Sequence, residues 1–127
     1  MLQTKDLIGK PFQDGGRGPE SYDCWGLVLE VFRRYGIELP DYQISCNADL
    51  NIDKQINAER CNWVRCHGEI PVPALVVIQE SGLCDHTGVY TGNGRFIHAR
   101  QKVGVVKEAV EQPVWKRRIE GFYVPGR

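Results

Sequence analysis

Hydrophobic positions between residues 22 and 35 recur with the period of an α-helix. One face of the predicted helix contains Cys24, Val28, Val31 and Tyr35. The apolar residues Trp25, Leu29 and Phe32 widen this face. Ser21 can cap the start of such a helix, and Asp23 suits its positive end. Gly36 and then Pro40 are typical of a helix end. The pattern therefore predicts an amphipathic helix over about 22–35.

The pattern changes to that of strands in the second half of the chain. Leu75 to Ile78 is a continuous apolar and branched run, which is typical of a buried strand. Further strands are predicted at 86–90, 95–99, 103–106 and about 118–123, with less regular helices at 2–8 and 52–61 and a glycine-rich loop at 9–20. A helix followed by hairpin-linked strands predicts an α+β domain, with an antiparallel sheet packed against the helix.

The register of one predicted hairpin decides whether two histidines can cooperate. Gly92-Asn93-Gly94 is a turn signal between the strands that carry His86 and His98. A two-residue loop, with Gly92 opposite Arg95, would send the two histidines to opposite faces. A three-residue loop would place His98 opposite Gly88, with His86 on the same face. We favour the three-residue loop, because Gly88 would then leave room for both rings.

Composition limits the classes of function. The chain has 127 residues, which suits one domain over 1–127, and 42% of them are hydrophobic. Sixteen basic residues balance sixteen acidic ones, so no strong positive field points to nucleic acid, and we expect Lys116-Arg117-Arg118 to be a solvated strand end. No apolar run is long enough to enter a membrane as a helix, and the N-terminus lacks the pattern of a signal peptide. We therefore expect synthesis in the cytoplasm.

The cysteine pattern favours free thiols over a disulfide framework. The count is odd, at positions 24, 46, 61, 66 and 84, and no signal peptide is evident. The spacing of Cys61, Cys66 and His67 does not match a common zinc pair. We expect no metal and no cofactor, unpaired reduced thiols, and a surface position for His67.

Cys24 has the sequence setting of a reactive thiol. It stands on the first turn of the predicted helix, where the helix dipole lowers a thiol pKa. A cysteine nucleophile also needs a nearby base, and that base needs a third group to hold its ring. Cys24, His86 and His98 can fill these three places in that order. Each histidine alone would be an ordinary strand residue.

Three segments together resemble the NlpC family of papain-like cell-wall endopeptidases, in particular its short phage-tail-associated type. Tyr22-Asp23-Cys24-Trp25-Gly26-Leu27-Val28 resembles the nucleophile motif of that family, and His86-Thr87-Gly88-Val89-Tyr90 with Phe96-Ile97-His98-Ala99 resembles its histidine hairpin. The opening Ile8-Gly9-Lys10-Pro11-Phe12 with Gly15-Gly16 is similar to the opening segment of the family. The closing Trp115 with Gly121-Phe122-Tyr123 is similar to the phage-type ending.

This resemblance implies a papain-like fold and a cysteine peptidase. It implies that Cys24 is the nucleophile, His86 the general base and His98 the orienting residue. Tyr22, Asp23 and Trp25 are then expected at the oxyanion or substrate site. The implied substrate is a peptidoglycan stem peptide, cut between γ-D-glutamate and the diamino acid. Other phage tail proteins are expected partners, and the virion tail or the cell wall is the expected destination.

Three alternatives remain open at this point. The chain could be a non-catalytic tail component that keeps the fold. It could be a cysteine acyltransferase or amidase of the same fold. It could also be a zinc-binding interaction module that uses Cys46, Cys61, Cys66 and Cys84. Digestion of defined peptides, detection of a lasting thioester and metal analysis would separate these alternatives.

Overall fold

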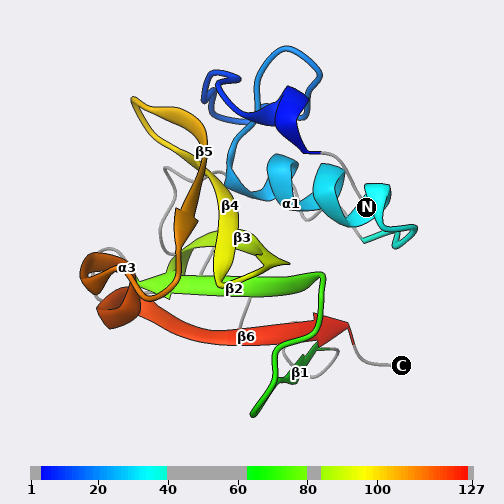
Figure 1. Cartoon of the computed structure of the whole chain (residues 1–127). Helices are drawn as coiled ribbons and strands as arrows, with labels where there is room; N and C mark the ends of the chain where they lie inside the picture. The colour runs from blue at the N-terminus through cyan, green and yellow to red at the C-terminus, as the bar shows by residue number, and fades with distance from the viewer. Residues whose placement is uncertain (1–3, 40–62, 80–83, 126–127) are drawn as a thin grey trace.

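A computed structural model describes residues 4–39, 63–79 and 84–125 of this chain. Figure 1 shows one long helix lying over a curved antiparallel sheet, with a shorter helix near the start of the last strand. The elements in chain order are η1 (Lys5–Leu7), α1 (Cys24–Arg34), β1 (Trp63–Arg65), β2 (Ala74–Gln79), β3 (Cys84–Gly92), β4 (Arg95–Arg100), β5 (Gly104–Ala109), α3 (Pro113–Arg118) and β6 (Ile119–Pro125). The predicted α+β class is confirmed.

Helix α1 begins two residues later than the sequence pattern predicts. Its N-cap is Asp23, whose side chain accepts a hydrogen bond from the Gly26 N–H, so the prediction of Ser21 as the cap was wrong. Aspartate and serine are both strong caps, and the position of the first helical turn decides between them. The helix ends at Arg34, and Gly36 follows with φ of 83°. This positive φ explains the glycine after the helix.

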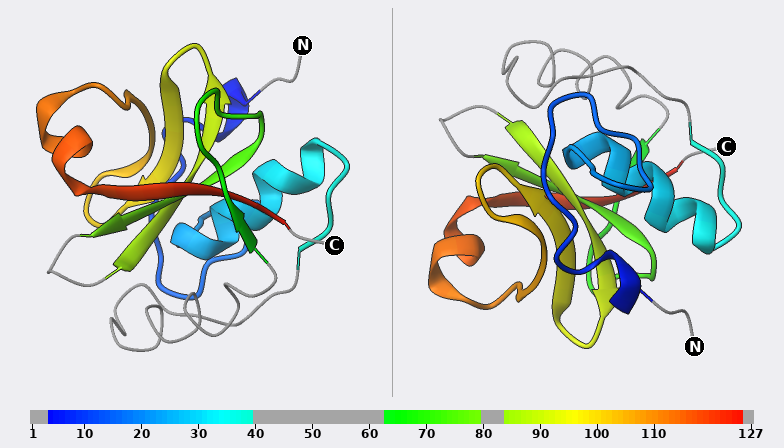
Figure 2. Two further views of the ribbon diagram at one scale, coloured as in Figure 1. Left: turned by 90° about the horizontal axis from the view of Figure 1, so that it is seen from below. Right: turned by 90° about the horizontal axis from the view of Figure 1, so that it is seen from above.

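The described strands form one antiparallel sheet in the order β1-β6-β2-β3-β4-β5. Strand β2 lies inside the sheet, and its run Leu75 to Ile78 is fully buried. Leu75 and Val77 pack in the cluster that contains α1, whereas Val76 and Ile78 pack in a second cluster with Trp115 of α3. Both faces of β2 are therefore covered, which explains its continuous apolar sequence. The two views of Figure 2 show α1 lying across the sheet.

The β3–β4 hairpin gives the expected facing of the histidines by a different turn. Gly92 pairs with Arg95, so the loop has two residues, Asn93 and Gly94, and the predicted three-residue loop was wrong. Both loop residues have positive φ, 56° and 71°, as a type I′ turn requires. The register then shifts between Tyr90 and Gly92, and Tyr90 pairs with Phe96. This bulge restores the register that places His98 beside Gly88.

Two elements were not predicted. Strand β1 has three residues and pairs with β6, and α3 has six residues with proline in its first turn. Lys116, Arg117 and Arg118 therefore form the last turn of α3 rather than a strand end, and their positive charges suit the negative end of a helix. The first predicted helix is the 3₁₀ turn η1. The helix predicted at 52–61 lies outside the described residues.

The described helices include none with the length and apolar character needed to cross a membrane.

The predicted strands at 75–78, 86–90, 95–99, 103–106 and 118–123 correspond to β2, β3, β4, β5 and β6. The glycine-rich segment at 9–20 is a loop with isolated bridges from Phe12 and Arg17 to Tyr22. This loop leads the chain into the start of α1.

Candidate active site

Cys24 is the first residue of α1, as its sequence setting indicates. Its side chain is 1% exposed, and α1 packs against β3 and β4, the strands that carry the two histidines. In this structure Cys24 is disulfide-bonded, so the expectation that it is a reduced thiol was wrong. Cys66 is free. The sulfur of Cys24 must therefore be reduced before it can act as a nucleophile.

His86 and His98 form a direct hydrogen bond from neighbouring strands. Nε2 of His86 and Nδ1 of His98 are 2.8 Å apart, and both rings are buried. The ring centroids lie 5.1 Å apart at an interplanar angle of 60°. Because His86 uses Nε2 for this bond, a proton transfer between His86 and another group would take place at Nδ1.

The absence of a side chain at Gly88 makes this approach of the two rings feasible. A Cβ atom at Gly88 would lie 2.8 Å from the carbonyl oxygen of Ile97 and 3.0 Å from Cβ of His98. Contacts this short would force the β4 backbone or the His98 side chain to move. The prediction that Gly88 makes room for His98 is confirmed.

Aromatic and acidic side chains hold His98 on its remaining sides. Its ring packs against Phe96, with centroids 4.5 Å apart, and edge-on against Trp115, with centroids 4.9 Å apart. Nε2 of His98 lies 2.8 Å from Oε2 of Glu108 on β5. Nη1 of Arg100 lies 3.6 Å from the same Oε2 atom. Both ring nitrogens of His98 therefore have hydrogen-bond partners.

Burial favours the neutral form of both histidines. It lowers the pKa of His98 to about 3, and the positive charge of Arg100 adds to this effect. The pKa of His86 is held well below its ordinary value by burial first, and then by the charges of His98 and Arg100. The carboxylate of Glu108 favours the charged form of His98 and so opposes this lowering. A neutral His86 has a lone pair and can accept a proton at neutral pH.

The three residues expected at the oxyanion or substrate site lie in the interior. Tyr22 is 3% exposed, and burial raises the pKa of its hydroxyl. Asp23 is fully buried and accepts hydrogen bonds from three donors: the Gly15 N–H, the Arg17 guanidinium and the Gly26 N–H. Trp25 is 1% exposed and belongs to the core cluster around α1. In this structure Asp23 thus joins the 9–20 loop to the start of α1.

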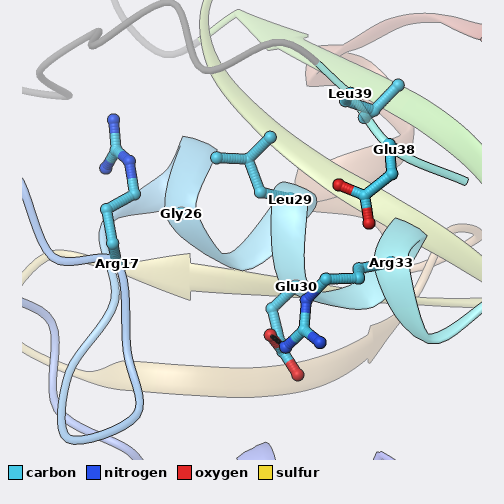
Figure 3. A pocket seen from close by; sticks show the side chains of 7 residues that line it. All are labelled: Arg17, Gly26, Leu29, Glu30, Arg33, Glu38 and Leu39. Atoms are coloured by element: carbon cyan, nitrogen blue, oxygen red, sulfur yellow. Dashed lines mark hydrogen bonds and ion pairs between the residues drawn. The ribbon is translucent and has the colours of Figure 1, made fainter.

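A hollow of about 260 Å³ lies beside the middle of α1. Its lining includes Arg17 and Gly26 near the start of the helix, and Glu30 and Arg33 farther along. Figure 3 shows these side chains around α1, with Leu29, Glu38 and Leu39. Arg17 pairs with Asp23, and Arg33 pairs with Glu30. The lining of the hollow includes acidic and basic side chains, and it includes neither His86 nor His98.

The described side chains contain no group of three metal-ligating residues that could hold an ion. The zinc module considered from the sequence would need Cys46, Cys61 and Cys84, whose side chains lie outside the described residues. His67 is exposed, as expected.

Most of this chain matches the model of a known protein family. The model of the NlpC/P60 family matches residues 9–124, which is nearly the whole chain. The chain belongs to the NlpC/P60 family. The match includes Cys24, His86 and His98, which the sequence motifs singled out.

Curated relatives of this NlpC/P60 chain carry cell-wall names. The murein DD-endopeptidase MepS/murein LD-carboxypeptidase of Escherichia coli K12 is 29% identical over 119 residues, which are 93% of this chain and 57% of that protein. The probable endopeptidase p60 of Listeria innocua is 28% identical over 123 residues, which are 96% of this chain and 23% of that protein. The chain thus spans about half, or less, of the length of these relatives.

Solved structures of the NlpC/P60 family share the fold. A protein described as similar to lipoprotein, of the NLP/P60 family, from Staphylococcus aureus matches with a TM-score of 0.66 and 21% identity. The match covers 95% of this chain and 38% of that one. The predicted papain-like NlpC fold, with its N-terminal helix packed on an antiparallel sheet, is therefore confirmed.

Sequence reasoning missed two residues that shape the site. Arg17, in the glycine-rich loop, pairs with Asp23, and Glu108 binds His98. Glu108 lies opposite Phe96 in the β4–β5 pairing, on the same face as His98. Strand alternation could have suggested Glu108 only if the register of β5 against β4 had been known.

Proposed function

We propose that this chain is a cysteine peptidase in which Cys24 is the nucleophile, His86 the general base and His98 the residue that orients His86. The hydrogen bond between His86 and His98 is the observation that carries the proposal. It provides a buried base whose second nitrogen is already bound. Membership of the NlpC/P60 family, whose model covers Cys24, His86 and His98, supports the same assignment.

The reaction begins only after the disulfide at Cys24 is reduced. The sulfur then attacks the carbonyl carbon of the scissile amide while Nδ1 of His86 accepts the thiol proton. His86 returns this proton to the leaving amine as the C–N bond breaks, and an acyl thioester remains on Cys24. Water then attacks the thioester, giving its proton to His86, and the protonated His86 returns it to the departing sulfur. The products are an amine and a carboxylic acid.

The negative oxygen that forms during attack needs hydrogen-bond donors. We assign the backbone N–H of Cys24 as the first donor, because the i→i−4 hydrogen bonds of a helix do not use the N–H groups of its first turn. The Tyr22 hydroxyl is proposed as the second donor. Removing one such donor typically costs about 10²–10³ in kcat. Asp23 and Trp25 would support this region from within the core, since both are buried.

The proposed substrate is a peptidoglycan stem peptide, cut between γ-D-glutamate and the diamino acid. The murein and endopeptidase names of the relatives support a cell-wall substrate. The choice of bond rests on the family resemblance of the cysteine and histidine motifs. Since the name of one relative includes both DD-endopeptidase and LD-carboxypeptidase, the test must distinguish among these products.

Defined muropeptides, incubated with the reduced protein and analysed by mass spectrometry, test this proposal. We expect a new amino terminus on the diamino acid, and no product with Cys24→Ser. Cys66→Ser removes a thiol that is free in the structure, just after β1, and should leave the products unchanged. Cleavage at a crosslink or at the peptide's carboxyl end would contradict the proposed bond, but not a peptidase activity.

A non-catalytic role is the second candidate, because Cys24 is buried and disulfide-bonded in this structure. In that case the disulfide would serve stability, and the reduced protein would release no more product than Cys24→Ser. The same digestion therefore separates the two functions. Retention of acyl groups on Cys24 after the digestion would instead favour an acyltransferase.

Delivery to the wall by a phage tail is a further part of the proposal, and it rests on the resemblance of Trp115 and of Gly121-Phe122-Tyr123 to phage-type endings. Synthesis in the cytoplasm followed by assembly into a virion would bring the enzyme to peptidoglycan. Peptide mass spectrometry of purified virions from a bacterium that carries the gene tests this route. Virions without the chain would contradict it.

A further inference from the structure

Glu108 lies at the far end of a chain of hydrogen bonds that passes through both histidines. Oε2 of Glu108 is 2.8 Å from Nε2 of His98, and Nδ1 of His98 is 2.8 Å from Nε2 of His86. Strands β3, β4 and β5 each supply one of the three side chains. The β4–β5 register places Glu108 opposite Phe96, so it is a diagonal neighbour of His98 on one face.

The chemistry of a carboxylate gives this chain a direction. An ionised carboxylate only accepts hydrogen bonds, so the proton of a neutral His98 must sit on Nε2, facing Glu108. Nδ1 of His98 then carries a lone pair and accepts from Nε2–H of His86. A neutral His86 protonated at Nε2 has its lone pair on Nδ1, which is the form that a general base needs.

The surroundings of Glu108 hold the carboxylate in place. Its side chain is 17% exposed, and Nη1 of Arg100 lies 3.6 Å from the same Oε2 atom. The Arg100 guanidinium in turn lies 5.3 Å from the centre of the Trp115 ring, and Trp115 packs against His98. Glu108 and Trp115 thus contact His98 directly, and Arg100 lies beside both of them. His98 itself has no exposed surface.

We propose that Glu108 is a positioning residue of the peptidase, and that it acts by fixing the tautomer of His98 and, through it, that of His86. The negative charge of Glu108 also stabilises the imidazolium that forms on His86, acting through His98, which is neutral and has no charge of its own. This inference rests on the proposed function, but the protonation pattern can be measured without activity. Glu108 does not touch the substrate in this account.

The test compares Glu108→Ala and Glu108→Gln in the full, reduced chain, with Glu111→Ala as the matched control. Glu111 is an exposed neighbour that pairs only at the surface with Lys116. Nitrogen-15 NMR of the histidine rings shows which nitrogens carry protons. Muropeptide cleavage gives kcat and KM, and thermal unfolding shows that each variant folds.

We expect His98 to be protonated mainly at Nε2 in the wild type. In Glu108→Ala this tautomer of His98 should no longer be the main one. Loss of a correctly set base should lower kcat about 100-fold in Glu108→Ala, at the low end of the 10²–10⁴ range that a general base contributes. The expected loss in Glu108→Gln is about tenfold. The glutamine loses less because its amide oxygen still accepts the N–H. KM should stay within about twofold, since no substrate contact is removed.

Two results would overturn the inference: wild-type His98 protonated at Nδ1, or Glu108→Ala with wild-type kcat and unchanged ring protonation. Failure of the proposed function gives a different pattern. If the reduced wild type cleaves no muropeptide while Glu108→Ala still changes the protonation of His98, the peptidase proposal fails and the effect of Glu108 on His98 stands.

Discussion

At the residue scale, Cys24 and Cys66, the two cysteines whose side chains the structure describes, differ in their helix context and in their bonding. Cys24 begins α1 and is disulfide-bonded, whereas Cys66 is free and half-buried just after β1. A helix N-terminus lowers a thiol pKa, whereas burial raises the pKa of Cys66. After reduction, the N-terminus of α1 should favour the thiolate form of Cys24, an effect that Cys66 lacks.

Alkylation of the reduced protein by a limiting amount of iodoacetamide tests this difference. We expect Cys24 to be labelled faster than Cys66, because the thiolate is the form that reacts with the reagent. Peptide mapping by mass spectrometry gives the two rates. Without reductant, Cys24 should not react. Faster labelling of Cys66 would remove the basis for a reactive Cys24.

Asp23 offers a second prediction at this scale, because its carboxylate accepts three hydrogen bonds in the interior. Asp23→Ala should lower the free energy of unfolding by about 2 kcal/mol, since it removes a helix cap and a charged hydrogen bond. Asp23→Asn keeps an acceptor for the Gly26 N–H and should lose less. Urea unfolding measures both. If Asp23→Asn is stable but has a raised KM, Asp23 contacts the substrate, as the family resemblance implies.

The residues of the site were predictable to different degrees. Cys24, His86 and His98 stand in local motifs that can be read from the sequence. Glu108 was not predictable, because its partner depends on how β5 pairs with β4 after the turn at 101–103. The disulfide at Cys24 was also missed, since an odd number of cysteines does not indicate which ones pair.

At the element scale, the β3–β4 hairpin brings the two histidines together through a bulge. The sequence predicted the correct facing of His86 and His98, but with the wrong loop, because a bulge of one residue has the same effect on the register as a longer loop. Helix α1 was predictable from its period alone. Strand β1 and helix α3 were not, because three and six residues are too few to show a period.

Substitution of Gly88 tests the hairpin packing. Gly88→Ala adds a methyl group 2.8 Å from the Ile97 carbonyl oxygen, and should cost about 1–3 kcal/mol in the free energy of unfolding. It should also shift the NMR signals of the His98 ring. Thr91→Ala, in the same hairpin but with an exposed hydrogen bond, is the control and should cost less than about 1 kcal/mol. Equal stability of the two variants would contradict the packing argument.

At the scale of the whole molecule, the sheet joins segments that are distant in the chain. The C-terminal strand β6 lies between β1 and β2, and so connects the end of the chain to its middle. The sequence predicted five of the six described strands but not their order, because strand patterns show which residues are buried and not which strands pair. The buried histidines near the centre of the sheet couple the stability of the whole fold to pH.

The sign of this coupling follows from the lowered pKa values of His86 and His98. Both histidines bind protons more readily in the unfolded chain, where the ordinary pKa is about 6.5. Stability should therefore be full above about pH 6.5 and fall as the pH drops below it. For His98 the fall continues toward about pH 3, by at most about 1.4 kcal/mol per pH unit.

Urea unfolding at about pH 7 and about pH 5 tests this coupling. The loss of stability between the two pH values should be smaller in His98→Gln than in the wild type, because one buried titrating group is gone. His67→Gln removes an exposed histidine and should behave as the wild type. An equal loss in wild type and His98→Gln would show that His98 is not held neutral by the fold.

A double-mutant cycle tests whether Cys24 and His86 act as one catalytic unit. The measurement is the rate of muropeptide cleavage by reduced wild type, Cys24→Ala, His86→Ala and the double variant. Groups that act as a unit lose nearly all of their effect when either is removed. We predict that the double variant is about as slow as the slower single variant. A double variant slowed by the product of the two single losses, or an active Cys24→Ala, would contradict the account.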